Sequence, residues 1–353
     1  MGVKSARPIS DIEGTIRSDN NTKRLLRSIR KGEIALIRHA DLDEPAAEGL
    51  LLAGVKAVVN AARTMTGKFP HEGPLCLLRS GVPVFEIEDE CFEAVRDGSM
   101  VTLSEGMLAV GPIAIPCRSF GWEEMIEANR LAEWSFGRTV IGFAENTLHY
   151  ANKELDMLLK PLDLPPLGRK IKMNHVLIVS RGKGYKEDLA ALRFYINEVK
   201  PVMVGVDGGA DALTAQGYRP DFIIGDMDSV SDETLHIAAQ LLVHAYVDGR
   251  APGLERIRRL GLSCDTVAAP GTSEDVAMRI AFEQEAAKIV IVGSHSHPVD
   301  FLEKGRAGMS STLLVRMMVG HKLVDAKGAS LWMQPKKPLL HVVPDLHISN
   351  KEP

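Results

Sequence analysis

The stretch VGVDGGADALTAQGYRPDFIIGDMDSVSDE, residues 204–233, decides the fold. It reads as a buried strand that ends at Asp207, a tight Gly208-Gly209 turn that opens a helix, and a second buried strand, FIIG, that ends at Asp226. Strand, helix and strand in this order predict a β-α-β unit of a parallel sheet. The two glycines allow a close turn whose N–H groups face an anion.

Acidic side chains follow both predicted strands. Asp207 ends the first, and Asp226-Met227-Asp228-Ser229 follows the second. Two carboxylates at i and i+2 beyond a strand end are a common way to hold Mg²⁺ among nucleotide phosphates. Each Asp could instead cap the helix after it. Because capping explains one acid at each strand end and not three acids at two, the pattern favours a metal–nucleotide site at Asp207, Asp226 and Asp228, with Ser229 beside them.

The same pattern extends outward over residues 173–330. HVLIVS, PVMVGVD, FIIGDMD, QLLVHAYV and AKIVIVGSH read as parallel strands separated by helical stretches. Such sheets bind ligands at the carboxyl ends of their strands. We therefore predict an α/β domain over 173–330, with an irregular tail over 331–353.

The preceding residues predict different structure. Residues 1–120 alternate short apolar runs with helical patterns, and MVTLSEGMLAVG suggests a closing hairpin, so we expect a smaller α/β domain. Residues 121–172 predict a helical connector of two helices, followed by a proline-rich linker. The basic run Lys23–Lys31 is either a contact for an acidic partner or membrane surface, or the solvated face of a helix.

Composition excludes several classes of function. Lys and Arg total 42 against 46 Asp and Glu, which gives a net charge of -4. The sequence therefore lacks the broad excess of basic residues that predicts nucleic-acid binding. Four cysteines without a C-x-x-C pair indicate reduced thiols. No stretch resembles a secretory signal or a membrane span, and we expect a cytoplasmic protein.

The motifs DGGADAL and PDFIIGDMDSV resemble the signature of thiamine pyrophosphokinases, which transfer a pyrophosphoryl group from ATP to thiamine. Over residues 174–325 this resemblance implies a Mg²⁺–ATP site at Asp207, Asp226 and Asp228. Asp275 is similar to a further metal carboxylate of the family, with Met278 at the position of a family Lys. Gly293 and Asp300 match a glycine-rich family loop, in which Pro298 replaces an Arg and Phe301 a His.

These departures bear on chemistry, since phosphoryl transfer depends on positive charge around the transferring oxygens. Arg250 and Arg306, each in a Gly-Arg-Ala context, are candidates to replace the missing cations. The family continues into a β-sandwich that helps to form the thiamine pocket, and the residues after Gly328 are too few for one. We therefore expect no such sandwich, which argues against thiamine as the acceptor.

HAYVDGRAPGLERIRRLG, FLEKGRAGMSSTLLVRMMVGHKLVDAKG and SRGKGYKEDL look like motifs of the SteA-type cytokinetic ring proteins of bacteria. This resemblance implies a Mg²⁺- and nucleotide-binding scaffold or switch with a cell-division or envelope protein as partner, and pyrophosphokinase-like domains imply a homodimer. Many members of the family end in membrane helices, which this sequence lacks. The alternatives are an active ATP-dependent pyrophosphokinase acting on thiamine or another small alcohol, and a fold kept only for protein contacts.

Three weaker candidates stay open. Arg181 and Lys183, after the first strand of this domain, either hold a phosphate or lie in a solvated turn. His295 and His297 either bind zinc or are polar loop residues. ALIRHADLDEP, AVVNAARTMTG, LRSGVPVFEI and VRDGSMVTLSEG are similar in order to the swivelling phosphohistidine domain, which would make His71 a candidate phosphate carrier or an ordinary surface residue.

Overall fold

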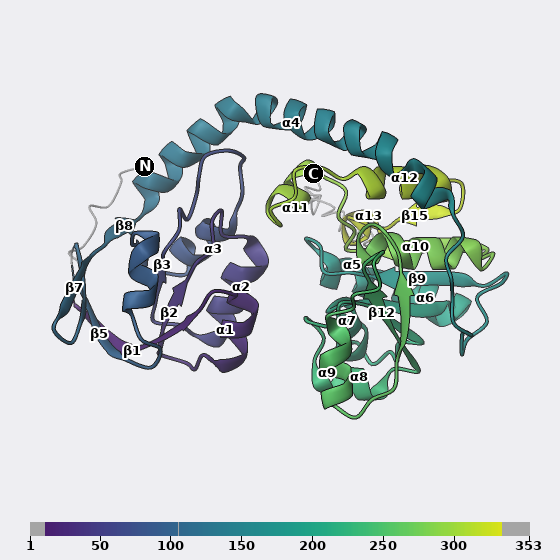
Figure 1. Cartoon of the computed structure of the whole chain (residues 1–353), viewed down its shortest axis with the longest axis horizontal. Coiled ribbons are helices and arrows are strands. Elements are labelled where there is room, and N and C mark those ends of the chain that lie inside the picture. The colour runs from purple at the N-terminus through teal and green to yellow at the C-terminus, as the bar shows by residue number, and fades with distance from the viewer. Residues whose placement is uncertain (1–10, 105, 334–353) are drawn as a thin grey trace, which may run out of the picture. The chain divides into compact units, whose positions relative to one another are not determined.

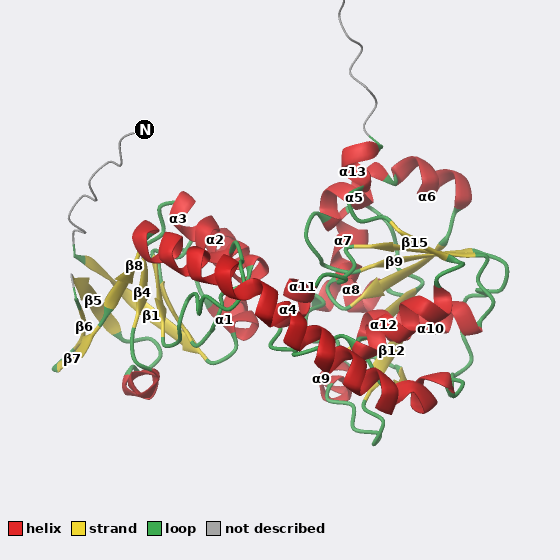
Figure 2. Cartoon of the chain, turned by 90° about the horizontal axis from the view of Figure 1, so that it is seen from above, coloured by secondary structure: helices red, strands yellow, loops and turns green. Residues whose placement is uncertain are grey.

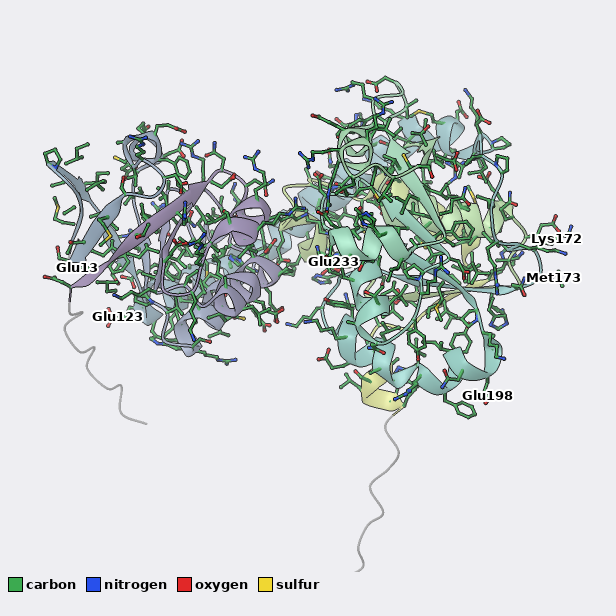
Figure 3. All side chains as sticks on the ribbon, turned by 90° about the horizontal axis from the view of Figure 1, so that it is seen from below. Glu13, Glu123, Lys172, Met173, Glu198 and Glu233 are labelled. Carbon is green, nitrogen blue, oxygen red and sulfur yellow. The ribbon has the colours of Figure 1, made fainter. Side chains whose placement is uncertain are left out.

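The computed structural model describes residues 11–104 and 106–333. They divide into two compact units, the first of the residues up to 160 with 295–314 and the second of 161–294 with the residues from 315 on. Residues 295–314 thus group with the first unit, although the sequence predicts them within one domain over 173–330. Of the predicted tail, residues 334–353 lie outside the described part of the chain. Charged side chains of both signs, among them Glu123, Lys172, Glu198 and Glu233, project outward (Figure 3).

The first unit contains one mixed sheet with strand order β7-β6-β5-β1-β2-β3-β4-β8 (Figure 1). The strands from β1 to β4 are parallel, whereas β5, β6, β7 and β8 pair antiparallel with their neighbours. The hairpin β5–β6 confirms the one predicted there. The strands are β1 (Ile12–Asp19), β2 (Ile34–Ile37), β3 (Ala57–Asn60), β4 (Val84–Glu86), β5 (Met100–Ser104), β6 (Met107–Val110), β7 (Ile113–Pro116) and β8 (Arg118–Phe120).

Helices cover one face of this sheet, where Leu50 and Leu77 pack on Ile37 and Val58. The expected pair of helices after residue 121 is wrong: α4 is one helix of 38 residues. No proline interrupts it before Pro161, so nothing in the chain forces a break. The helices are α1 (Thr22–Ser28), α2 (Glu44–Ala53), α3 (Gly73–Arg79), the 3₁₀ turn η1 (Asp89–Ala94), α4 (Trp122–Leu159) and α11 (Pro298–Leu302), with α12 (Ser310–Val319) starting in this unit and ending in the second.

The second unit is built on an all-parallel sheet with strand order β13-β12-β11-β10-β9-β14-β15. All five strands predicted from the sequence are present, and β13 and β15 are added at the edges. Strand order reverses at β9, which lies between β10 and β14. The strands are β9 (His175–Val179), β10 (Val202–Val206), β11 (Phe222–Gly225), β12 (Gln240–Ala245), β13 (Asp265–Ala268), β14 (Lys288–Val292) and β15 (Leu323–Asp325).

Helices lie on both faces of this sheet (Figure 2). One buried cluster joins Leu177 and Val292 to Leu189 and Leu213, and another joins Ile223 and Val243 to Leu235 and Ile257. The helices are α5 (Tyr185–Ala191), α6 (Arg193–Val199), α7 (Gly209–Ala215), α8 (Asp232–Ile237), α9 (Gly253–Arg259), α10 (Ser273–Glu283) and α13 (Ala329–Trp332). Among the described residues, no helix combines the length and the apolar character needed to cross a bilayer.

Candidate functional site

Asp207 connects the turns that follow β10 and β11. Its backbone is left-handed, with φ of 46°, and its Oδ1 accepts a hydrogen bond of 3.2 Å from Met227 N. A Cβ on Gly225 would fall 1.8 Å from that oxygen, so only glycine leaves room for the carboxylate. The structure therefore brings the predicted Asp207 against the predicted Asp226–Asp228 segment.

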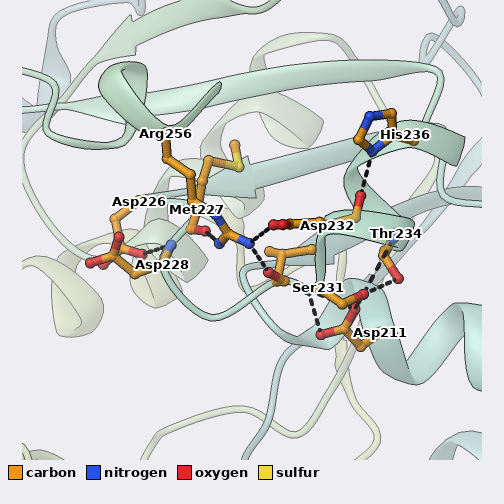
Figure 4. Close-up of polar contacts among 10 residues, drawn as sticks. Asp211, Asp226, Met227, Asp228, Ser231, Asp232, Thr234, His236 and Arg256 are labelled. Atoms are coloured by element: carbon orange, nitrogen blue, oxygen red, sulfur yellow. Dashed lines mark hydrogen bonds and ion pairs between the residues drawn. The ribbon is translucent and has the colours of Figure 1, made fainter. Parts of the chain in front are cut away.

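Residues 226–228 form what we call the acidic turn. Met227 is buried with φ of 63°, and this anchor leaves Asp226 and Asp228 exposed on either side of it. The Asp228 N–H donates to Asp226 Oδ1 over 2.9 Å (Figure 4). The next predicted residue, Ser229, is half-buried. Two carboxylates thus face solvent at one strand end, as the spacing predicts.

Arg256 on α9 holds the acidic turn in place, and sequence reasoning did not single it out. Its guanidinium donates to the carbonyl oxygens of Met227 and Val230 and pairs with Asp232 (Figure 4). On α7, Asp211 accepts bonds from the N–H and hydroxyl of Ser231. The turn is fixed from two sides by residues distant in sequence, which a local motif does not reveal.

A positive side chain lies against the turn that follows Asp207. Gly208 follows Asp207, and a Cβ on Gly208 would fall 2.2 Å from Arg181 Cζ, so the guanidinium lies on this glycine. Both residues border a hollow of about 330 Å³ on α5 and α7, which we call the Arg181 pocket. Its other lining residues are Tyr185, Lys186, Asp211, Ala212, Ala215 and Gln216.

The loops after β9 and β14 meet at the point where strand order reverses. Gly182 N donates to Gly293 O over 2.9 Å, and a Cβ on Gly293 would fall 2.2 Å from Ser180 O. The predicted Gly293 thus lies beside the predicted Arg181 loop, whose Lys183 is exposed. Gly209, on the neighbouring turn, packs so closely on Val179 O that a Cβ would fall 1.9 Å from it. Ligands of doubly wound sheets bind at such reversal points.

Asp275 behaves as a helix cap. It is fully buried, its Oδ2 accepts from Thr272 N, and its own N–H donates to Thr272 Oγ1. Beside it, Glu274 Oε1 accepts from Ser180 Oγ over 2.7 Å and ties α10 to the end of β9. Arg279, a cation that sequence reasoning missed, is 1% exposed on the same helix and pairs with Glu283.

The fit of these acids to Mg²⁺ depends on what else coordinates the ion. Over residues 11–104 and 106–333, no three His, Cys, Asp or Glu side chains are grouped closely enough to hold a metal. Mg²⁺ in phosphate-handling sites is bound through one or two carboxylates together with phosphate oxygens and water. Asp226 and Asp228 fit that role, whereas an all-protein cage of Asp207, Asp226, Asp228 and Asp275 is not preformed.

The remaining predicted residues have local partners. Arg250 pairs with Asp248 at 2.7 Å, and this bond raises the pKa of Arg250. Asp300, in the first unit, accepts from the N–H groups of Ser296 and His297 and caps α11. Arg306, also in the first unit, is exposed.

His297 stacks on Phe136, with ring centroids 6.3 Å apart, and its Nδ1 accepts from Val299 N. These contacts, with no grouped metal ligands in the described part of the chain, favour the polar-loop interpretation of the His295–His297 pair over zinc.

The first unit also gathers polar side chains at the carboxyl ends of its parallel strands, and they bond to one another. Asn60 accepts from His39 N and donates to His39 O, and Glu86 accepts from Thr64 N at 2.6 Å. His71 is buried between the carbonyl oxygens of Phe69 and Thr64, so it is no ordinary surface residue. Burial lowers the pKa of His39, and the neighbouring His71 lowers it further.

Comparison with known proteins places a family signature on the acidic turn. Residues 195–248 match the family model for the thiamin pyrophosphokinase catalytic domain, and this range includes Asp207, Asp226 and Asp228. A thiamin pyrophosphokinase from Geobacillus thermodenitrificans is 24% identical over 43% of this chain and 58% of its own, with a TM-score of 0.28. Residues 195–248 of the second unit are therefore similar to the thiamin pyrophosphokinase catalytic domain.

The chain also shows similarity to the solved structure of 3-isopropylmalate dehydratase (leuD) from Methanocaldococcus jannaschii. It is 11% identical over 35% of this chain and 98% of its own, with a TM-score of 0.23. No curated protein matches the chain. The SteA-type resemblance and the swivelling domain stay predictions.

Proposed function

We propose that the second unit binds a nucleotide together with Mg²⁺, with ATP as the first candidate. The observation that carries this is the arrangement of the turns after β9, β10 and β11: Asp207 bonds to the acidic turn on one side, and its neighbour Gly208 supports Arg181 on the other. Carboxylates suit the metal, and a guanidinium suits phosphate oxygens through paired N–H donors. Asp226 and Asp228 would hold the ion, and Arg181 would hold a phosphate.

We further propose that this protein is a SteA-type scaffold or switch in bacterial cell division or envelope assembly, acting in the cytoplasm as a homodimer. The sequence motifs support that assignment, as does the chemistry of α10, where the family Lys position is the buried Met278. Without that cation, and with Arg250 paired to Asp248, the described site holds less positive charge for pyrophosphoryl transfer. Nucleotide binding would then act by favouring one conformation over another.

Thermal unfolding tests the binding step. The purified chain is heated with ATP, ADP and GTP, each with Mg²⁺ and with EDTA. A nucleotide at 100 times its Kd should stabilise the chain by about 2.7 kcal/mol. A shift that needs Mg²⁺ and disappears in Asp226→Asn/Asp228→Asn supports the proposal. If no nucleotide raises the melting temperature, the proposal is wrong, and the remaining hypothesis is a fold kept only for protein contacts.

The alternative is an active pyrophosphokinase, favoured by the intact acidic residues within the matched catalytic domain. In that case the hydroxyl oxygen of the acceptor attacks the β-phosphorus of ATP and loses its proton to water, the bond from that phosphorus to the α-phosphate oxygen breaks, and AMP leaves. AMP release from ATP is therefore measured with thiamine and with other small alcohols. Release that depends on one added acceptor establishes the enzyme, whereas nucleotide binding without AMP release supports the switch.

A further inference from the structure

The long helix α4 carries an exposed apolar stripe. Trp134, Ile141, Leu148 and Leu155 are 80%, 61%, 59% and 41% exposed, and each follows the previous one by seven residues. Leu, Ile and Trp are normally buried on one side of a surface helix. An apolar row left open along four successive heptads therefore indicates a surface that another element covers.

The other side of α4 is already used within the first unit. Phe143 packs near Phe301, with ring centroids 6.2 Å apart, and Ser135 Oγ donates to Gly67 O. Ala132, Thr147, Ala151 and Leu158 are buried on this inner side. The exposed stripe borders this packed side: Ala151 and Leu158, three residues after Leu148 and Leu155, are buried, whereas Gly137 and Ala144 at the equivalent positions are exposed.

Small residues accompany the stripe. Gly137 and Ala144 are exposed three residues after Trp134 and Ile141, and a Cβ on Gly137 would meet no heavy atom within 4 Å. Apolar residues at alternating steps of three and four are the seam of a coiled coil. From Trp134 to Leu148 the large seam positions alternate with the small, exposed Gly137 and Ala144, so a partner helix can approach closely there.

We propose that this stripe pairs antiparallel with the same stripe of a second copy of the chain. In a parallel pair, the large side chains of one helix would face the large side chains of the other, and the small residues would face small residues, which leaves gaps. Antiparallel pairing interleaves them, with Ile141 opposite Ala144 of the second copy and Leu148 opposite Gly137 of the second copy.

Charge at the edge of the stripe complements this arrangement. Arg138 and Glu145 are exposed beside the stripe at equivalent heptad positions and have opposite signs. Antiparallel pairing brings Arg138 of each copy near Glu145 of the other, which forms two symmetric ion pairs. The inference deepens the proposed homodimer by naming its interface, and it does not depend on the nucleotide site, which lies in the second unit.

Light scattering after size-exclusion chromatography of the full chain tests the interface. The wild-type chain should show twice its 38.5 kDa mass, and Ile141→Glu/Leu148→Glu should show the mass of one chain. Leu52→Glu, at an 83% exposed position on α2, is the matched control and should remain dimeric. A wild-type monomer, or a dimer that survives Ile141→Glu/Leu148→Glu, would overturn the proposal.

A charge exchange tests the antiparallel direction. Arg138→Glu should weaken the dimer roughly five- to tenfold, since two ion pairs become repulsive contacts. Arg138→Glu/Glu145→Arg should restore wild-type dimerisation, and failure to do so would contradict this pairing. Each variant is also heated with Mg²⁺ and ATP. An unchanged nucleotide shift in a monomeric variant shows that the interface and the nucleotide site are separate, and so distinguishes failure of either proposal.

Discussion

The two sheets place polar side chains at equivalent positions, the carboxyl ends of parallel strands, and use them in opposite ways. In the first unit, Asn60, Thr64 and Glu86 are buried and bond to neighbouring side chains or backbone. In the second, Asp226 and Asp228 are exposed, and the intervening Asp207–Gly208 turn separates them from the Arg181 guanidinium. Polar groups that satisfy one another stabilise the fold, whereas exposed charges of both signs at one end of a sheet suit a charged ligand.

The largest expected effect is a fall in the free energy of unfolding of the first unit. Asn60→Leu removes the partners of both His39 N and His39 O in a buried setting, so we expect the free energy of unfolding to fall by about 2–4 kcal/mol. Urea unfolding followed by tryptophan fluorescence measures it, because Trp122 and Trp134 lie in α4 of this unit. Asn197→Leu, at an exposed position, is the control. Equal loss in both variants would contradict a structural role for this cluster.

Arg256 is the corresponding structural element of the second unit. Arg256→Ala should lower the free energy of unfolding by about 2 kcal/mol, because two carbonyl oxygens lose a charged donor. The freed acidic turn should also bind Mg²⁺–nucleotide more weakly. Arg259→Ala, an exposed arginine on the same helix, should change neither quantity. Full nucleotide affinity in Arg256→Ala would show that the turn needs no positioning.

Arg181 is expected to affect binding and to leave folding nearly unchanged. Arg181→Ala should weaken nucleotide binding about tenfold through loss of one charged hydrogen-bond donor. Gly208→Ala should weaken it similarly, since its Cβ displaces the guanidinium. Calorimetric titration measures both, with Gly168→Ala as the control. The proposed phosphate role fails if the Arg181→Ala titration matches wild type.

The smallest expected effect is a pH dependence in the first unit. Burial lowers the pKa of His39 in the folded chain, so the unfolded chain binds this proton more readily. Its contribution to stability is therefore complete above the unfolded pKa of about 6.5 and is lost as the pH falls below it. Urea unfolding at pH 7.5 and 5.5 should show a smaller difference for His39→Gln than for wild type. An equal difference would assign the pH dependence to another group.

The sequence predicted the parts of the molecule that depend on local pattern. Buried apolar runs indicated five strands of the second sheet, and the doubled acids indicated the exposed pair at Asp226 and Asp228. Arg256 and Arg279 were missed, because a helical arginine carries no sign of the loop or helix it contacts across the fold. The metal role of Asp275 stays a prediction, and the structure shows this side chain buried in a capping box with Thr272, a role that the same spacing also allows.

The central claim is that the acidic turn and Arg181 form one Mg²⁺–nucleotide site, and the anisotropy of a fluorescent ATP analogue tests it most directly. The analogue is titrated with wild type, Asp226→Asn/Asp228→Asn and Arg181→Ala, each with Mg²⁺ and with EDTA. We predict that wild type binds the analogue tightly only when Mg²⁺ is present, and that affinity falls about tenfold or more in both variants. In the aspartate variant, EDTA should cause no further loss of affinity. Equal affinity of all three proteins, with or without Mg²⁺, would contradict the claim.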